Sequence, residues 1–127
     1  MRAFLSVLCL VWLCLPAWSI SPHRLSLQQV LKAPHRIARV RLLECSDQTA
    51  HRGHRWHFRF LDLADGKKIL ELDYFESWPY EAPDGKLEAP IYTGSGLEQK
   101  ARPGEQFQAI YSVDDPAHLL RLEPDAP

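Results

Sequence analysis

Three histidines spaced three residues apart are the side chains in this sequence best suited to metal chemistry. His51, His54 and His57 lie in the segment TAHRGHRWHFRF, residues 49–60. Neutral imidazole is the commonest metal ligand in proteins, and three or four nitrogen or oxygen ligands make a zinc or copper site. Residues three apart on a strand point to opposite faces, and His57 falls within a strand pattern. The spacing therefore leaves His51 and His54, in the preceding loop, as the pair that could bind Zn or Cu.

The neighbours of this pair support a second interpretation. Asp47 or His35 could supply a further ligand, but Arg52 and Arg55 flank the histidines and disfavour a bound cation. A solvated basic loop that leads into a core strand fits the same residues, and it is the interpretation that we prefer. We therefore expect no cofactor, with the zinc or copper site as the alternative.

A run of basic residues surrounds the histidines. Between residues 32 and 59 the chain has seven Lys and Arg and only two acidic residues, whereas residues 71–88 have six acidic residues and one Lys. Arg39, Arg41 and Arg59 share a solvated face if the first two strands pair, and acidic residues of the next strand can balance them. The neighbouring aromatic residues alternate away from the arginines, so they form no stacking platform for bases. We expect this face to bind a protein partner and no nucleic acid.

Aromatic residues among prolines mark a second candidate binding surface. Residues 76–104 carry four prolines and four glycines, which exclude a regular helix or central strand throughout. Long irregular segments in small domains are often functional, and Trp78, Tyr80 and Tyr92 are suitable hot-spot residues for a partner. The alternative is that these rings cover one end of the core.

Residue patterns of known enzyme sites are missing from the sequence. The segment TGSG, residues 93–96, lacks the G-x-S-x-G spacing of a nucleophile elbow and is too short for a phosphate-binding loop. Cys45 has histidines only at unrelated spacings. We therefore expect a protein that is not an enzyme.

The N-terminal segment MRAFLSVLCLVWLCLPAWS has the pattern of a Sec-type export signal. Arg2 supplies the positive charge, an apolar run follows, and Ala17 and Ser19 take the small-residue positions before a cleavage site. An uncleaved anchor is the alternative, because residues 4–20 are just long enough to span a bilayer. We expect export to the bacterial periplasm with loss of residues 1–19, or attachment to the inner membrane if the signal is retained.

Removal of the signal leaves residues 20–127, the size of one domain. Arg2 is the only charged residue lost, so the formal net charge changes from −1 to −2. This balance argues against general binding to nucleic acids or anionic membranes. Cys45 becomes the only cysteine, and its place at the end of an apolar strand pattern predicts a buried, inert thiol. A disulfide-linked dimer is the alternative.

Hydrophobic alternation predicts strands along most of the remaining chain. The pattern recurs in RIARVRLLEC, RWHFRFLDL, KKILELDYF, EQFQAIYSV and HLLRLE. Before them, SLQQVLKAP predicts one short helix with a capping box of Ser26 and Gln29. Pairing Phe60 with Leu70 keeps the apolar faces of the second and third strands together, and it implies a three-residue loop, 64–66, with Gly66 in the left-handed region.

The closing segment PGEQFQAIYSVDDPAHLLRLEP, residues 103–124, resembles a hairpin in a family of bacterial membrane-associated and exported domains of unknown function. The resemblance is carried by Gly104, Tyr111, Asp115, Pro116 and Leu120. It implies a strand, turn and strand, and no activity.

These patterns together predict a mainly β protein. The expected fold is a small antiparallel five-stranded OB-like barrel with one short N-terminal helix, and a small sandwich is the alternative. The domain would extend over residues 20–127 and include a long irregular loop, 76–104. We expect an exported, non-enzymatic binding or accessory domain whose partner is an exported or envelope protein. A periplasmic metal-binding protein and an inhibitor or immunity-type protein are the alternatives.

Overall fold

A computed structural model describes residues 23–125, so the predicted export signal and its cleavage site lie outside the described residues. Within this range, none of the helical segments has the length and apolar character needed to span a membrane. The elements are β1 (His23–Arg24), α2 (Leu27–Val30), β2 (His35–Ala50), β3 (Gly53–Asp62), β4 (Ile69–Ser77), β5 (Tyr80–Glu81), β6 (Leu87–Glu88), β7 (Ile91–Tyr92), η1 (Leu97–Gln99), β8 (Gln106–Ser112) and β9 (Leu119–Pro124).

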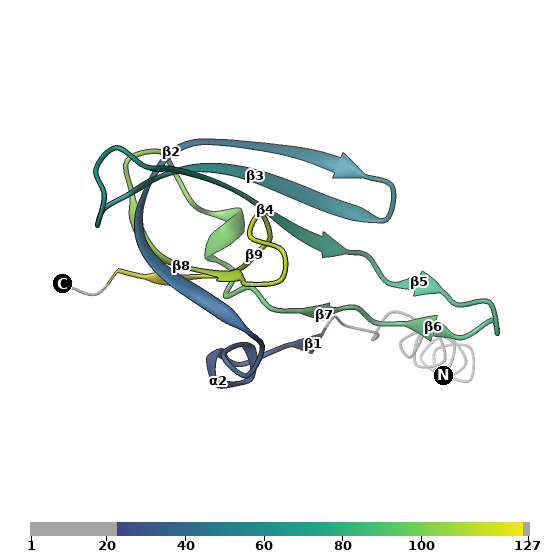
Figure 1. Ribbon diagram of the computed structural model, residues 1–127. Helices are drawn as coiled ribbons and strands as arrows, with labels where there is room; N and C mark the ends of the chain where they lie inside the picture. Colours follow the sequence, from purple (N-terminus) through teal and green to yellow (C-terminus); the bar gives the residue numbers. More distant parts are fainter. Residues whose placement is uncertain (1–22, 126–127) are drawn as a thin grey trace, which may run out of the picture.

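The main sheet has five antiparallel strands in the order β4-β3-β2-β8-β9 (Figure 1). Two further pairs, β1 with β7 and β5 with β6, form separate two-stranded sheets. The predicted mainly β class is therefore confirmed. Helical structure in the described chain is limited to α2 and η1, each about one turn long.

The predicted barrel is wrong, because the curled sheet does not close. Edge strand β4 bonds to the turn just before the other edge strand, β9: the Asp73 N–H donates to the Ala117 carbonyl at 2.7 Å, and Asp73 forms an isolated bridge with His118. β8 pairs with only the first part of β2, His35 to Arg41, and β9 has six residues. This side of the sheet is too short to pair along the length of β4. A sandwich is not formed either, since the two further sheets of the described chain are short ribbons.

The predicted pairing of the β3–β4 hairpin is confirmed. Phe60 lies opposite Leu70, and the charged residues Arg59 and Glu71 lie opposite each other on the other face. The register follows from hydrophobic alternation, because a shift of one residue would place carboxylates against aromatic rings.

The turn of this hairpin differs from the prediction. The Leu63 N–H bonds to the Arg39 carbonyl of β2, so Leu63 is not available to the hairpin. The hydrogen bond that closes the turn runs from the Asp62 N–H to the Lys68 carbonyl at 2.9 Å. Within the turn, the Asp65 carboxylate accepts the Lys67 N–H at 3.1 Å. Gly66 is not in the left-handed region, because this longer turn is stabilised by Asp65 and needs no positive φ.

The concave face of the sheet holds the core. Alternate residues of each main strand point inward and exclude water, which is the dominant favourable contribution to folding. The buried cluster consists of Val40, Leu42, Phe58, Phe60, Leu72, Tyr74, Phe107, Ala109, Leu119 and Leu122. Most of these residues follow directly from the predicted strand faces.

Cys45 is exposed because β8 does not cover the part of β2 on which it lies, although a bulge sets it opposite the buried Phe58. The β2–β3 register shifts between Leu42 and Glu44, so Leu43 is an extra residue that reverses the alternation. Cys45 lies on the part of β2 beyond its pairing with β8, and its thiol is free and exposed. The prediction of a buried thiol is therefore wrong.

The N-terminal helix is a single turn, α2. Its predicted capping box is present: the Ser26 hydroxyl accepts the Gln29 N–H, and the Gln29 side chain accepts the Ser26 N–H. Val30 of this turn packs on Ile110 and Leu120 in a second, smaller apolar cluster. The turn therefore covers part of the sheet without forming a layer of its own.

The segment predicted as a long irregular loop, 76–104, contains short elements. β5 and β6 form a small hairpin that extends away from the sheet, and β7 returns alongside β1 (Figure 1). We call the hairpin with its connections, residues 75–92, the arm. η1 follows and lies against the concave side of the sheet, where Leu97 packs on the core.

Candidate binding surfaces

The arm carries five of the nine large hydrophobic side chains that are exposed in the described part of the chain. Two belong to the predicted site, and three further ones were not predicted to bind. Their exposed fractions are 43% for Phe75, 47% for Trp78, 36% for Tyr80, 50% for Leu87 and 65% for Ile91. Phe75 could have been found from the sequence, because the alternation of KKILELDYF places it on the solvated face with two carboxylates. Large apolar side chains that are exposed on a projecting segment make this segment a candidate interaction surface.

Hydrogen bonds hold the arm in a defined conformation. The Trp78 N–H donates to the Arg52 carbonyl in the β2–β3 turn at 2.7 Å, and the Arg52 guanidinium lies 5.4 Å from the centre of the Tyr80 ring. The Tyr80 hydroxyl donates to Glu88 across the β5–β6 pair at 2.7 Å, and this bond raises the pKa of Tyr80. The arm therefore presents its apolar side chains on an ordered backbone, which lowers the entropy cost of binding.

Tyr92, the third predicted aromatic residue, has a structural role. It is half-buried, its hydroxyl donates to the Ser77 carbonyl at 2.7 Å, and the Arg24 guanidinium lies 5.3 Å from its ring centre. These contacts tie β7 to the end of β4 and to β1. Trp78 and Tyr80 thus lie on an accessible surface, whereas Tyr92 supports it.

A buried polar network fixes the base of the arm. The Tyr74 hydroxyl donates to Glu76 at 2.6 Å and accepts the Gly94 N–H at 3.1 Å. Burial, together with the neighbouring Glu76 carboxylate, raises the pKa of Tyr74 far above its ordinary value. Arg24 of β1 pairs with Glu76 at 3.3 Å and donates to the Gly94 carbonyl at 2.6 Å. Because each polar group has a partner, the network can be buried at modest cost.

The segment TGSG has a structural use that its sequence did not reveal. Thr93 and Ser95 donate their hydroxyls to carbonyls of Leu120 and Leu122, each at 2.5 Å. The buried Glu98 carboxylate accepts the Leu122 N–H at 2.8 Å and the Gly96 N–H at 2.9 Å. These side chains satisfy the backbone groups on the outer edge of β9, where a barrel would have another strand.

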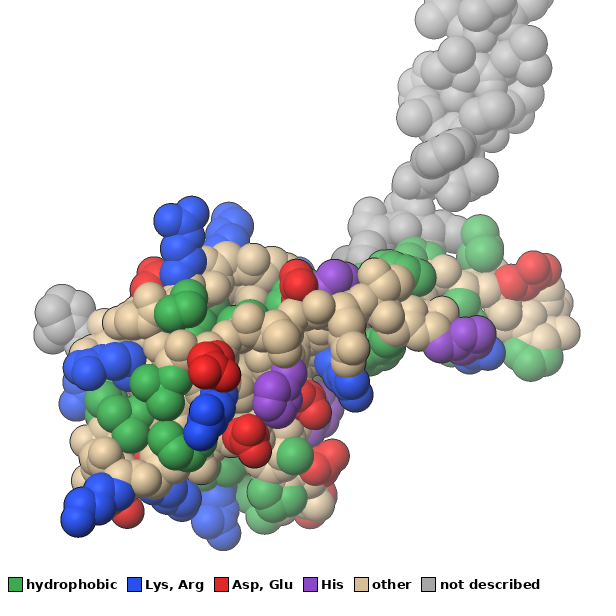
Figure 2. Space-filling model, turned by 90° about the horizontal axis from the view of Figure 1, so that it is seen from above, with side chains coloured by type: hydrophobic (Ala, Val, Ile, Leu, Met, Phe, Trp, Pro, Cys, Tyr) green, Lys and Arg blue, Asp and Glu red, His purple; other side chains and the backbone are tan. Residues whose placement is uncertain are grey.

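The three arginines of the predicted basic face are exposed, as expected from alternation, and two of them, Arg39 and Arg59, have acidic partners. Arg39 forms a two-pronged pair with Asp125, at 2.9 and 3.0 Å, and this bond lowers the pKa of Asp125. Arg59 lies 3.9 Å from Glu44, and Arg41 lies opposite Gln106 of β8. Figure 2 shows basic and acidic side chains interspersed on the face seen there. The acidic partners of Arg39 and Arg59 weaken the field that this face could exert on a charged partner.

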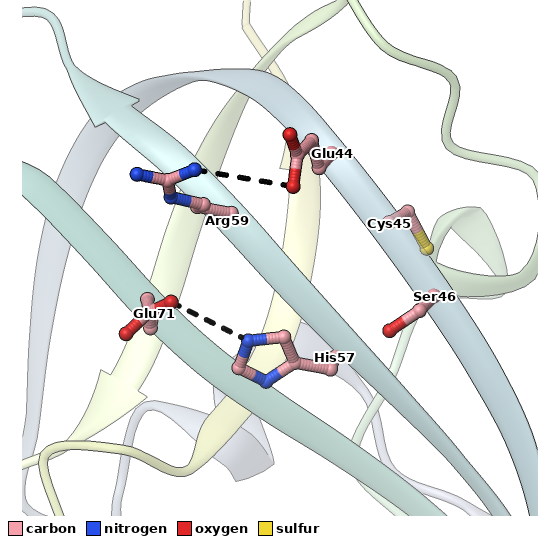
Figure 3. A pocket seen from close by; sticks show the side chains of 6 residues that line it. All are labelled: Glu44, Cys45, Ser46, His57, Arg59 and Glu71. Atoms are coloured by element: carbon pink, nitrogen blue, oxygen red, sulfur yellow. Dashed lines mark ion pairs between the residues drawn. The ribbon is translucent and has the colours of Figure 1, made fainter.

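A shallow pocket of about 380 Å³ lies over β2, β3 and β4 (Figure 3). Its lining includes Ser46, His57 and Glu71. Register places Ser46, His57 and Asp73 side by side on three strands, and His57 Nδ1 lies 2.5 Å from Asp73 Oδ1. His57 Nε2, however, points toward Glu71 at 3.7 Å and not toward the Ser46 hydroxyl. The imidazole is thus not placed to activate the Ser46 hydroxyl. The contact of His57 with Asp73 is a cross-strand pair that supports the sheet.

The histidines predicted as metal ligands do not converge with a third ligand. His51 lies in the two-residue turn between β2 and β3. His54 lies on β3, 3.4 Å from Asp47, and its ring contacts the Trp56 ring in a tilted arrangement at 4.4 Å between ring centres. The Nδ1 of His35 contacts the Ala33 carbonyl. In the described part of the chain, no three His, Cys, Asp or Glu side chains are grouped so that they could hold a metal ion.

Comparison with known proteins found no matching family model, no significantly similar curated protein and no significantly similar solved structure. The resemblance of residues 103–124 to an exported family therefore receives no support from these comparisons.

Proposed function

We propose that this protein is an exported, non-enzymatic binding or accessory domain that contacts a protein partner through the arm. The observation that carries the proposal is the ordered display of five exposed apolar side chains on a segment that extends from the sheet. Aromatic residues on an ordered backbone are typical binding hot spots, because they bury much surface and lose little conformational freedom. The charge-balanced arginine face is a weaker candidate surface.

Site-specific photo-cross-linking tests this proposal. A photoreactive amino acid at Leu87, on the arm, should give one discrete adduct with an envelope or exported protein in living cells. The same amino acid at Ile37, which is 52% exposed on β2, is the matched control and should not give this adduct. A smear, or the same adducts from both positions, would exclude a specific arm surface.

Trp78→Ala distinguishes a binding role from a structural one. Because the side chain is about half exposed, its loss should abolish the Leu87 adduct while the melting temperature stays within a few degrees of wild type. A large fall in melting temperature would instead show that Trp78 supports the fold.

An inhibitor or immunity-type protein is a second candidate, because the arm is narrow enough to enter a cleft. In that case the cross-linked partner would be an enzyme, and the purified protein would inhibit it at stoichiometric concentration. Variants of Trp78 and Tyr80 should weaken inhibition in parallel with the cross-link.

Export and metal content are tested together by intact mass and elemental analysis of untagged protein, expressed from the full sequence in an export-competent bacterium. The proposal expects a mass that begins at Ile20 and no stoichiometric metal. Retention of residues 1–19 would favour a membrane-anchored form, and stoichiometric Zn or Cu would favour the metal-binding alternative.

A further inference from the structure

The second half of β2 has an open edge. β8 pairs with β2 from His35 to Arg41, and the Leu42 N–H and carbonyl bond to Glu105 and Gly104. Beyond this point, residues 43–49 are all exposed. Within the described chain, β3 alone pairs with them, and Figure 1 shows this part of β2 at the outer border of the sheet.

Open edges of this kind are templates for another strand, and proteins protect them with Lys, Pro, bulges or covering segments. The segment LECSDQTA, residues 43–50, contains no Lys, Pro or Gly, and its single bulge is at its start. The contrast with β9 is informative, because side chains from residues 93–98 cap the β9 edge. In the described chain, no such segment caps β2 beyond Leu42.

We propose that a second copy of this chain pairs antiparallel with this edge, across a two-fold axis at Gln48. Two identical edges can pair symmetrically only if one residue faces its own copy on the axis. An axis at Gln48 places Gln48 opposite the partner's Gln48, and Ser46 opposite the partner's Ala50. The result is one continuous sheet that contains both copies, in the manner of strand addition.

Sterics and charge disfavour the axes at Ser46 and at Asp47. An axis at Ser46 would bring the partner's turn against Leu42, whose backbone groups already bond to Glu105 and Gly104. An axis at Asp47 would set that carboxylate against the partner's Asp47, and directly opposed like charges destabilise a sheet.

With the axis at Gln48, complementary side chains face one another. The Gln48 amides can bond to each other, and Asp47 lies opposite the partner's Thr49, whose hydroxyl is a donor. The segment is therefore complementary to a second copy of itself. This complementarity is the reason for proposing a second copy, and not another protein, as the strand that pairs with the open edge of β2.

Disulfide trapping tests the pairing and its register. In a Cys45→Ser background, Gln48→Cys should form a disulfide-linked dimer under mild oxidation, because the two thiols meet on the axis. The matched control, Ser46→Cys in the same background, should stay monomeric on a non-reducing gel, since its thiols lie four residues apart along the paired strands. Sedimentation of the wild type should show a reversible dimer.

A charge introduced on the axis supplies an independent test. Gln48→Asp should weaken dimerisation about fivefold, whereas Gln48→Asn should leave it nearly unchanged. A monomer at all concentrations, equal trapping at positions 46 and 48, a native Cys45 disulfide, or trapping of a different protein would each overturn the proposal. None of these outcomes bears on the arm, so the two proposals fail separately.

Discussion

Replacing Gly94 with Ala tests whether the buried network at the base of the arm is tightly packed. A Cβ at Gly94 would come within 3.0 Å of both the Tyr74 hydroxyl and the Glu98 carboxylate. Overpacking of a core costs about 1–3 kcal/mol, and displacing the Tyr74 hydroxyl loses hydrogen bonds worth about 1 kcal/mol each. We expect a fall of about 3 kcal/mol in the free energy of unfolding, and of roughly 15 °C in the melting temperature.

Urea denaturation followed by tryptophan fluorescence measures this change, with Gly66→Ala as the matched control. A Cβ at Gly66 meets no atom within 4 Å, and the residue is outside the left-handed region, so its replacement should change stability by less than about 0.5 kcal/mol. If both variants unfold at the same urea concentration, the polar network is loosely packed and does not hold the arm in place.

Three other predictions concern the core, the contacts of Arg24 that hold β1 in place, and the reactivity of Cys45. Phe58→Ala removes a fully buried ring and should cost about 4 kcal/mol in urea unfolding. Arg24→Ala removes the partner of Glu76 and should cost about 2 kcal/mol, with faster hydrogen exchange at the β1 amides. Partial burial and then the Asp47 charge raise the pKa of Cys45, so at pH 8 its labelling should be slower than that of a free thiol. Asp47→Asn should lower that pKa and speed labelling, and an unchanged pH–rate profile would contradict the assigned charge effect.

The β3–β4 register could be predicted from the sequence because strict alternation leaves one arrangement in which both faces are consistent. Phe60 opposite Leu70 and Arg59 opposite Glu71 follow from that requirement alone. The capping box of Ser26 and Gln29 could be predicted for a similar reason, since both partners lie within one helical turn. Local patterns thus determined the features that depend on neighbouring residues.

Features that depend on contacts between distant segments could not be predicted. In the run LLEC the leucines at 42 and 43 are both apolar, so alternation does not show which is the bulged residue. The exposure of Cys45 was missed because it depends on where the distant strand β8 stops covering β2. Closure of the sheet depends on the lengths of the strands and on which segment fills the gap between β4 and β9. Hydrophobic alternation gives information on neither. The part played by Glu98 was missed because its donors come from Leu122 as well as from nearby residues.

Two unpaired strand edges of the sheet, that of β9 and that of the second half of β2, are treated differently, and this difference links the fold to its proposed interactions. Along β9, hydroxyls of Thr93 and Ser95 and the carboxylate of Glu98 occupy backbone groups that would otherwise seek a strand. Burial of the Glu98 carboxylate is costly unless hydrogen-bond donors surround it. The cap on the β9 edge therefore depends on a buried charge that its donors must stabilise. The edge of β2 near Gln48 lacks such a cap within the described chain, although a single lysine or proline would protect it. An edge left open beside one that is capped at such cost is best explained as a surface kept available for another strand.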